Sequence, residues 1–212
     1  MTPSELAFSA ATVSMLLTSA AQASPVFRVR PAGQEQVEIS ATGLITNSGV
    51  LAASQLTATG STIVRWSPGG GLQTLGNPAY VRPLFTDVLN VASARAISGN
   101  GDVIVGSAYS TGAGVLMGYR WDSVNGFKLL SIGPRCNVDA VSSDGQVAAG
   151  SLSPGSTEMP VYWTEPTGEH AVGGASDSDF RDASSDGSVL VGYLAGTFES
   201  FAGRWTQSTG YV

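Results

Sequence analysis

The sequence predicts an all-β fold assembled from four repeats of about 42 residues, and three observations predict it. Charged residues make up only 12% of the chain, about half of the usual ~25% share, while glycines number 27. A short segment that combines a turn with an apolar run recurs four times. All four tryptophans occupy one position of the repeat, which chance does not produce.

The turn is the first anchor of the repeat. Its four copies read ITNSGVLAAS, ISGNGDVIVGS, VSSDGQVAAGS and ASSDGSVLVGY. Each copy has a hydroxyl residue followed three positions later by glycine: Thr46 and Gly49, Ser98 and Gly101, Ser142 and Gly145, Ser184 and Gly187. Asn-Gly and Asp-Gly favour positive φ, and a preceding Ser or Thr bonds to the turn backbone. We therefore expect a tight turn between two antiparallel strands in every repeat.

The segment after each turn predicts a strand that is buried on both faces. It is apolar at successive positions and ends at Gly106, Gly150 or Gly192, where the absence of a side chain permits close backbone approach. A third strand ends at tryptophan, and glycine follows five residues later, which predicts another turn into a fourth strand. The tryptophans are Trp66, Trp121, Trp163 and Trp205.

Four strands in about 42 residues, without helical periodicity, indicate sheets stacked face to face. This is typical of a β-propeller-like fold, either a closed four-bladed ring or a truncated arc of a larger propeller. The extra residues within Asn77–Asn90, which include Tyr80, Arg82 and Phe85, predict a loop inserted between the first two repeats. Val26–Arg30 reads as a spare fourth strand, and we expect it to close the ring beside the strand that ends at Trp205.

The repeat resembles a known family. Its SDG turn, its RW anchor and the glycine that follows are similar to the bacterial extracellular repeats of the HAF family, over nearly all of residues 41–212. The chain departs from that family in having no histidine before its tryptophans, and in having Ser54 where the later copies have glycine. The resemblance implies an exported protein or an autotransporter passenger region, and it implies no defined biochemistry.

The N-terminus predicts export. Residues 1–23 form an apolar, small-residue stretch that ends in Ala21-Gln22-Ala23, the pattern of a signal peptide cleavage site before Ser24. The stretch contains Glu5 and no basic residue, so a plain N-terminal helix is the alternative. We expect residues 24–212 to form the repeat domain and the protein to be secreted or held at the cell surface. No later segment reaches transmembrane length, so no direct membrane insertion is expected.

Composition also limits the ligands, metal ions and cofactors that the protein is expected to bind. A net charge of −6 without a basic cluster disfavours nucleic acid. Cys136 is the only cysteine and His170 the only histidine, so no cysteine cluster or zinc site is expected, and each turn offers one carboxylate, too few for calcium. No cofactor-binding motif occurs. We therefore predict no catalytic, metal-binding or cofactor-binding residues, and the binding residues are not identified.

Two groups of charged residues have plain structural interpretations. Asp177, Asp179, Arg181 and Asp182 form the densest charge cluster, which predicts a solvated loop. An arginine precedes three of the tryptophans and, because adjacent strand residues face opposite ways, lies on the other side of the sheet: Arg65, Arg120 and Arg204.

These observations favour an exported, non-catalytic module for surface binding or extracellular scaffolding, with a carbohydrate or a protein as its unknown ligand. Two alternatives stay open. The chain is a propeller-type glycosidase or polysaccharide lyase, or it is a fragment of a longer autotransporter passenger. Two carboxylates at glycosidase separation in one pocket would favour the enzyme.

Overall fold

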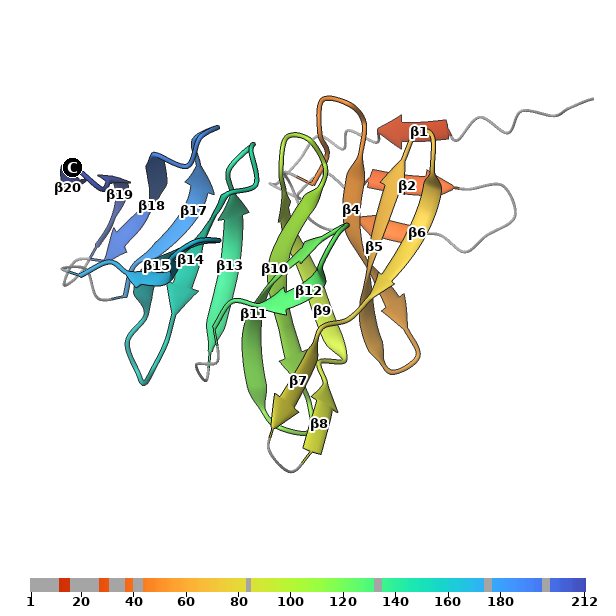
Figure 1. Cartoon of the computed structure of the whole chain (residues 1–212), viewed down its shortest axis with the longest axis horizontal. Coiled ribbons are helices and arrows are strands. Elements are labelled where there is room, and N and C mark those ends of the chain that lie inside the picture. Colours follow the sequence, from red (N-terminus) through yellow and green to blue (C-terminus); the bar gives the residue numbers. More distant parts are fainter. Residues whose placement is uncertain are drawn as a thin grey trace, which may run out of the picture.

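The fold is all-β, as predicted (Figure 1). The computed structural model describes residues 12–15, 27–30, 37–39, 44–82, 85–131, 135–173, 177–195 and 199–212. None of these residues is helical. The strands form one seven-stranded sheet, two four-stranded sheets and two smaller sheets, and we use the word unit for the described strands of each sequence repeat. No helix in the described part of the chain is long and apolar enough to cross a membrane.

The first two repeat units share a seven-stranded sheet. Unit 1 consists of β4 (Leu51–Thr57), β5 (Gly60–Ser67) and β6 (Gly71–Gly76). Unit 2 consists of β9 (Val91–Ile97), β10 (Val103–Ser110), β11 (Val115–Asp122) and β12 (Gly126–Leu129). Within this sheet each unit is an antiparallel meander. One parallel residue pair, Ser61 with Val91, joins the two units through β5 and β9.

Units 3 and 4 are four-stranded antiparallel meanders whose strands follow in sequence order. Unit 3 consists of β13 (Cys136–Val141), β14 (Val147–Leu152), β15 (Met159–Thr164) and β16 (Gly168–Ala171). Unit 4 consists of β17 (Asp179–Ala183), β18 (Val189–Ala195), β19 (Ser200–Thr206) and β20 (Gly210–Tyr211). The four units lie side by side, from unit 1 on the right of Figure 1 to unit 4 on the left.

The predicted turn forms in all four units. In unit 3 the Ser142 hydroxyl donates to Asp144 (2.5 Å) and accepts from the Val147 amide (3.0 Å), while the Gly145 amide donates to the Ser142 carbonyl. The turn glycines adopt φ between +69° and +79°. Asp144 thus serves its own turn, which is the structural role that one carboxylate per turn predicts.

The second strand of the middle repeats is buried on both faces, as predicted. In β10 the first six residues, Val103–Ala108, are all buried, and the four central residues of β14 are as well. Three apolar clusters fill the spaces between units 1 and 2, units 2 and 3, and units 3 and 4. Stacked sheets, rather than helices, therefore provide the layers that these strands need.

The insertion is a hairpin and not the loop that we expected. Within Asn77–Asn90, β7 (Ala79–Arg82) pairs antiparallel with β8 (Phe85–Val88) and projects from one end of the molecule (Figure 1). The two strands are rich in aromatic and β-branched residues, which favour strand pairing over irregular structure. Tyr80, Arg82 and Phe85 lie on these two strands, and their side chains are outside the described part of the structure.

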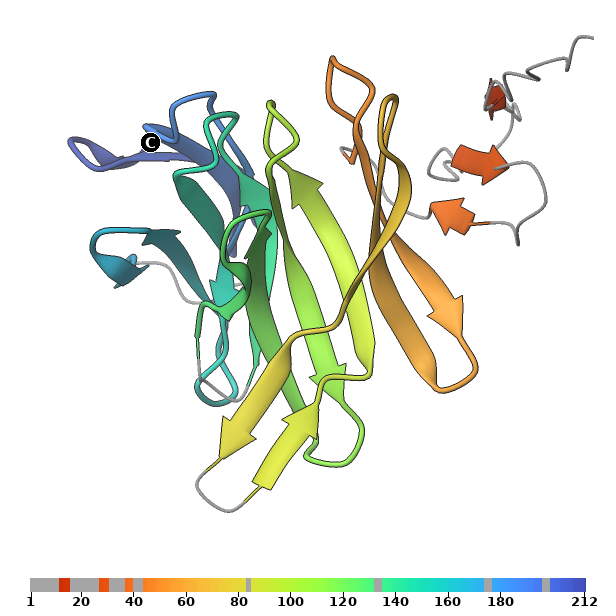
Figure 2. The same ribbon diagram turned by 45° about the vertical axis from the view of Figure 1, so that its right-hand side comes forward.

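The predicted ring closure is wrong. Strand β2 (Phe27–Arg30) pairs with β1 (Thr12–Met15) and β3 (Val37–Ile39) in a three-stranded sheet beside unit 1, at the opposite end of the molecule from unit 4 (Figures 1 and 2). Unit 4 completes its meander with β20 instead. Pairing between neighbours in the chain closes shorter loops and so costs less conformational entropy than pairing across the whole chain.

The interpretation of residues 1–23 as a signal peptide stays a prediction. Strand β1 lies within the stretch that we interpreted as a signal peptide, 1–23, and the rest of that stretch is outside the described residues.

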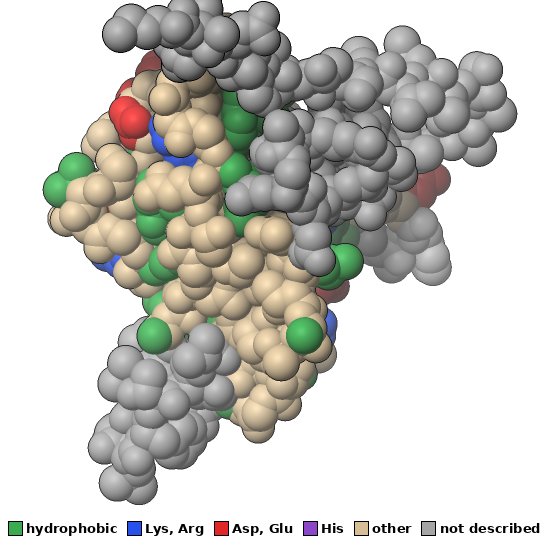
Figure 3. Space-filling model, turned by 90° about the vertical axis from the view of Figure 1, so that its right-hand side faces the viewer, with side chains coloured by type: hydrophobic (Ala, Val, Ile, Leu, Met, Phe, Trp, Pro, Cys, Tyr) green, Lys and Arg blue, Asp and Glu red, His purple; other side chains and the backbone are tan. Residues whose placement is uncertain are grey.

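Figure 3 views the molecule from the unit 1 side, where few charged side chains appear among the described residues. This agrees with the low charge content of the sequence.

Candidate functional site

The first strand of each of units 2, 3 and 4 contains a β-bulge, and the bulged residue is charged in every case. The strand register shifts across Arg95 in β9, Asp139 in β13 and Arg181 in β17. Each of these residues stands three positions before the turn serine of its repeat. A bulge re-aims a side chain relative to the regular ladder, so the repeat places three charged groups at equivalent positions of adjacent units.

These groups form a ladder of alternating charge, which we call the charge ladder: Arg95, Asp139, Arg181 and Asp179. Arg95 Nε lies 3.8 Å from Asp139 Oδ1, Arg181 Nη1 lies 3.3 Å from Asp139 Oδ2, and Arg181 Nη2 lies 2.9 Å from Asp179 Oδ2. The carboxylates are largely covered, with 10% and 1% of their side chains exposed, while the two arginine side chains are about half exposed.

Asp179 is the most perturbed member of the ladder. Burial raises the pKa of its carboxyl to about 7, and the nearby charges of Asp139 and Glu158 add to the rise, while Arg181 opposes it. Neither carboxylate oxygen accepts a hydrogen bond of good geometry from the described residues; Arg181 Nη2 lies 2.9 Å from Oδ2, and the Ser151 side chain also lowers the pKa. This corrects the sequence interpretation, which placed Asp179 in a solvated loop.

The raised pKa of Asp179 predicts a pH-dependent stability. The native state keeps this proton up to about pH 7, whereas the unfolded chain releases it near 3.8. The stabilisation is therefore complete below about pH 4 and is lost as pH rises to 7. We expect Asp179→Asn to be more stable relative to wild type at pH 8 than at pH 5, by about 2–3 kcal/mol in urea unfolding. The exposed neighbour Asp182, changed to Asn, is the control. An equal difference at both pH values would contradict the assignment.

A second group of polar side chains borders the ladder. Glu158 accepts hydrogen bonds from the Ser151 hydroxyl (2.5 Å) and the Tyr193 hydroxyl (3.0 Å). The Arg181 guanidinium lies 5.5 Å from the centre of the Tyr193 ring, a cation–π contact. Burial raises the pKa of Tyr193, and the bond to Glu158 raises it further. Arg181 therefore contacts the Tyr193 ring in addition to Asp139 and Asp179.

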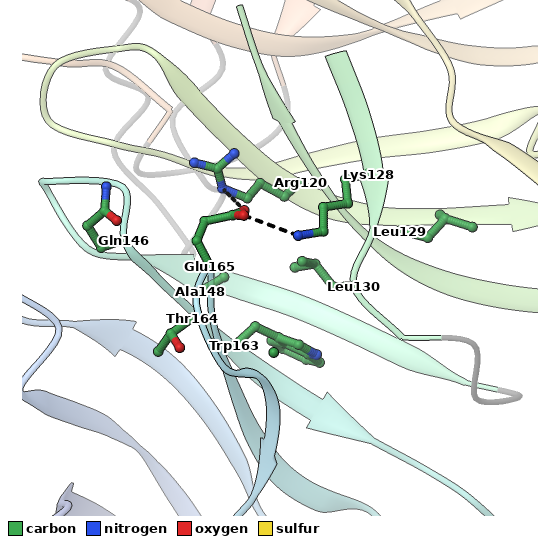
Figure 4. A pocket seen from close by; sticks show the side chains of 10 residues that line it. Arg120, Lys128, Leu129, Leu130, Gln146, Ala148, Trp163, Thr164 and Glu165 are labelled. Carbon is green, nitrogen blue, oxygen red and sulfur yellow. Dashed lines mark hydrogen bonds and ion pairs between the residues drawn. The ribbon is translucent and has the colours of Figure 1, made fainter. Parts of the chain in front are cut away.

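The close-up in Figure 4 shows a pocket between units 2 and 3, with Glu165 reaching toward Arg120 on one side and Lys128 on the other. Arg120 Nε lies 3.4 Å and Lys128 Nζ 3.1 Å from the Glu165 carboxylate, and Arg120 also pairs with Asp122. The pocket has a volume of about 50 Å³ and includes the buried Trp163 in its lining. A volume of this size leaves room for a few water molecules.

The tryptophan and arginine pattern places the two side chains on opposite sides of each sheet, as predicted. Trp163 of unit 3 packs on Val103 and Val105 of unit 2, the preceding unit. Arg120 of unit 2 donates to the Gly145 carbonyl of unit 3, the following unit, at 3.5 Å. In unit 2, which has both residues, Trp121 lies in the apolar cluster shared with unit 1 while Arg120 reaches unit 3, so the pair links this unit to both neighbours.

The lone cysteine and histidine are each engaged in packing. Cys136 is fully buried, and burial raises the pKa of its thiol to about 12, so the thiol is neutral at physiological pH. His170 stacks on Tyr162, with ring centres 4.7 Å apart, and its Nε2 bonds to the Thr167 hydroxyl. No group of three or more His, Cys, Asp or Glu side chains in the described part of the chain is placed to hold a metal ion.

Sequence reasoning missed the charge ladder. It singled out Arg181 and Asp179 as part of one local cluster, and it did not single out Arg95 or Asp139. The repeat alignment contains the signal, because a charged residue stands three positions before the turn serine in three successive copies. The three positions approach one another only because of the way the units stack, and an alignment of the repeats does not show how they stack.

The stacked antiparallel meanders and the solved structures that they match give the chain a β-propeller-like fold. It is similar to TolB from Acinetobacter baumannii, with a TM-score of 0.57 and 16% identity over 95% of this chain and 49% of that one. It is also similar to a TolB assigned to Agrobacterium tumefaciens (TM-score 0.57, 14% identity, 87% of this chain and 71% of that one). For the tricorn protease the TM-score is 0.54 and the identity 12%, over 85% of this chain and 20% of that one.

These likenesses concern the fold alone. The chain spans about half the length of the Acinetobacter TolB. No family model matches the sequence, and no curated protein matches it.

Proposed function

We propose that this chain is an exported, non-catalytic repeat module that binds a ligand at the charge ladder. In this proposal the repeat units are blades of a propeller, whether a four-bladed ring or an arc of a larger one, and the first strand of each blade faces the centre. Export is supported by the signal-like stretch 1–23 and by the resemblance to the extracellular HAF repeats. The observation that carries the binding proposal is the asymmetric exposure of the ladder.

The exposed groups of the ladder are cationic. Asp139 and Asp179 lie beneath the surface, whereas Arg95 and Arg181 are about half exposed. Arg95 has only the long 3.8 Å contact through its Nε, so the amino groups of its guanidinium point to no partner among the described residues. A guanidinium offers a planar pair of donors that matches a carboxylate. The ladder therefore suits a ligand that carries carboxylate groups, which acidic carbohydrates and acidic peptides share.

The same geometry supports binding over catalysis. One feature favours the alternative function of a propeller-type glycosidase or lyase. Asp179, with a pKa of about 7 and Asp139 nearby, resembles one member of an acid and base pair. However, the Asp179 side chain is only 1% exposed and lies against Arg181, so it does not reach a bound sugar. The Cys136 thiol is buried and neutral, and the His170 ring is stacked away on Tyr162.

Titration calorimetry tests this proposal with an oligogalacturonate as the acidic carbohydrate, a polyglutamate peptide as the acidic protein probe, and a maltooligosaccharide as the neutral control. We expect binding of one acidic probe that weakens with salt, and a loss of about tenfold or more in affinity for Arg95→Gln and for Arg181→Gln. The matched control is Lys128→Gln, which removes one positive charge at the pocket between units 2 and 3.

Three results would contradict the proposal. Equal affinity of the arginine variants and the wild type would place the ligand elsewhere. If neither acidic probe binds, or if only the neutral probe binds, the ligand does not carry carboxylate groups. New reducing or unsaturated ends released from oligogalacturonate would favour the enzyme.

A further inference from the structure

Each repeat unit is joined to the next by the same contact between valine and glycine. A methyl group built on Gly101 would lie 2.9 Å from Val50, one on Gly145 would lie 2.7 Å from Val103, and one on Gly187 would lie 2.3 Å from Val147. Val103 and Val147 begin the second strand of their units, Val50 directly precedes β4, and each glycine belongs to the turn of the following unit. Only glycine leaves room for this approach, so the contact is a specific docking element of the repeat.

The residue before the tryptophan adds a second contact to the same interface. Arg65 Nε of unit 1 donates to the Gly101 carbonyl of unit 2 at 3.0 Å, and Arg120 of unit 2 donates to the Gly145 carbonyl of unit 3. In unit 3 the equivalent residue is Tyr162, whose ring packs on Trp205 of unit 4 at 5.1 Å between ring centres. Units 1, 2 and 3 thus each place a valine against the turn of the following unit, and units 1 and 2 add an arginine that donates to a carbonyl of that turn.

In unit 4 the equivalent valine and arginine positions have no described unit packed against them. Val105 and Ala149 occupy the middle of the second strand in units 2 and 3 and are fully buried, whereas the equivalent Val191 is 40% exposed. Arg204, directly opposite Val191 on the neighbouring strand, is exposed, and its side chain makes no hydrogen bond or ion pair with the described residues. We call Val189, Val191, Ala202 and Arg204 the unit 4 face.

The receiving half stands at the other end of the same chain. The turn of unit 1 has the same geometry as the others, with Gly49 at φ +79°. A methyl group built on Gly49 would meet only Pro68 of its own unit, at 3.6 Å, among the described residues, and Trp66 of that unit is half-buried. No valine of a preceding unit is described against it. The described residues of units 1 and 4 therefore present the two halves of one interface.

We propose that the unit 4 face docks on the unit 1 turn of a second copy of this chain. Val191 and Val189 pack on the Gly49 turn, and Arg204 donates to a turn carbonyl, as the internal interfaces already do. Such a contact is heterologous, so it builds a ring where the rotation closes and an open chain of copies where it does not. The sheet β1–β2–β3 lies on the same side of unit 1 (Figure 2) and competes for this position, so we expect weaker association than between units of one chain.

Sedimentation velocity on the full chain tests the proposal over about 5 to 200 µM, a range that detects micromolar association. We expect the mean mass to rise with concentration in the wild type and to stay that of a monomer in the double variant Val191→Asp, Arg204→Glu. The matched control is Val124→Asp, which changes an 88% exposed valine on the turn between β11 and β12, away from the unit 4 face. The urea midpoint of each variant shows that the fold is intact.

A mixing experiment then fixes the orientation. The double variant keeps its unit 1 turn, so a labelled sample of it binds wild-type chains but not itself. Labelled variant that binds neither would indicate that two unit 4 faces meet each other, and the head-to-tail contact would be wrong. A wild type that stays monomeric at all concentrations, or association lost equally in Val124→Asp, would overturn the proposal altogether.

Discussion

Trp163→Ala is expected to lower the free energy of unfolding by about 3–5 kcal/mol, the cost of removing a buried large aromatic side chain. Trp163 is 2% exposed and packs on Val103 and Val105 of the preceding unit, so its loss opens a cavity between two units. Its indole N–H also donates to Glu169 at 3.3 Å. Urea unfolding, followed by circular dichroism so that the signal does not depend on tryptophan, measures the change.

Two companion variants separate the causes. Trp163→Phe keeps an aromatic ring in the interface and removes the bond to Glu169, so we expect it to lose less stability than Trp163→Ala. Trp66→Ala changes the equivalent but only half-buried tryptophan of unit 1, and we expect a smaller effect. A small effect of Trp163→Ala, together with weaker binding of an oligosaccharide probe, would show instead that this ring serves a ligand.

Gly150→Ala is expected to be at least as severe, with a loss of about 3 kcal/mol or more, because the added methyl group meets backbone that cannot yield easily. A Cβ on Gly150 would lie 2.2 Å from the Asn137 carbonyl oxygen, at the bulge that places Asp139. The equivalent distances are 2.0 Å at Gly106 and 1.9 Å at Gly192. The same close approach of two strands therefore recurs in units 2, 3 and 4.

Gly155→Ala is the matched control for this variant. Gly155 lies in the loop between β14 and β15, has no positive φ, and has no atom within 4 Å of an added Cβ. We expect its stability to stay within about 0.5 kcal/mol of the wild type. If Gly150→Ala were equally mild in urea unfolding, the strands would not approach as closely as the bulge requires.

Much of the fold could be predicted because the relevant signals are local. The turn serine, the turn glycine and the glycine that ends the second strand each act within a few residues, so their repetition reveals the hairpin at every copy. The opposite placement of Trp163 and Arg120 relative to their sheets followed from strand alternation alone. The insertion was located correctly but interpreted as a loop, since a short hairpin carries a weak alternating signal.

The candidate site could be predicted only in part. Arg181 and Asp179 were visible as a charge cluster, yet the burial of Asp179 depends on Tyr193, Glu158 and the adjacent unit, which lie elsewhere in the sequence. The partner of Arg181 in the preceding unit, Asp139, is 42 residues away and meets it only because both occupy bulges. Such pairings depend on how the sheets stack, and no local pattern encodes that.

The sequence by itself therefore determined the repeat, its turns and the all-β class, because a turn is specified by the allowed φ of its own residues. The tertiary structure alone decided three other features: the pairing of β2 with β1 and β3, the charge ladder, and the uncovered unit 4 face. These depend on contacts between residues far apart in the chain, where burial, charge and loop entropy of the whole molecule select among pairings that the local sequence permits equally.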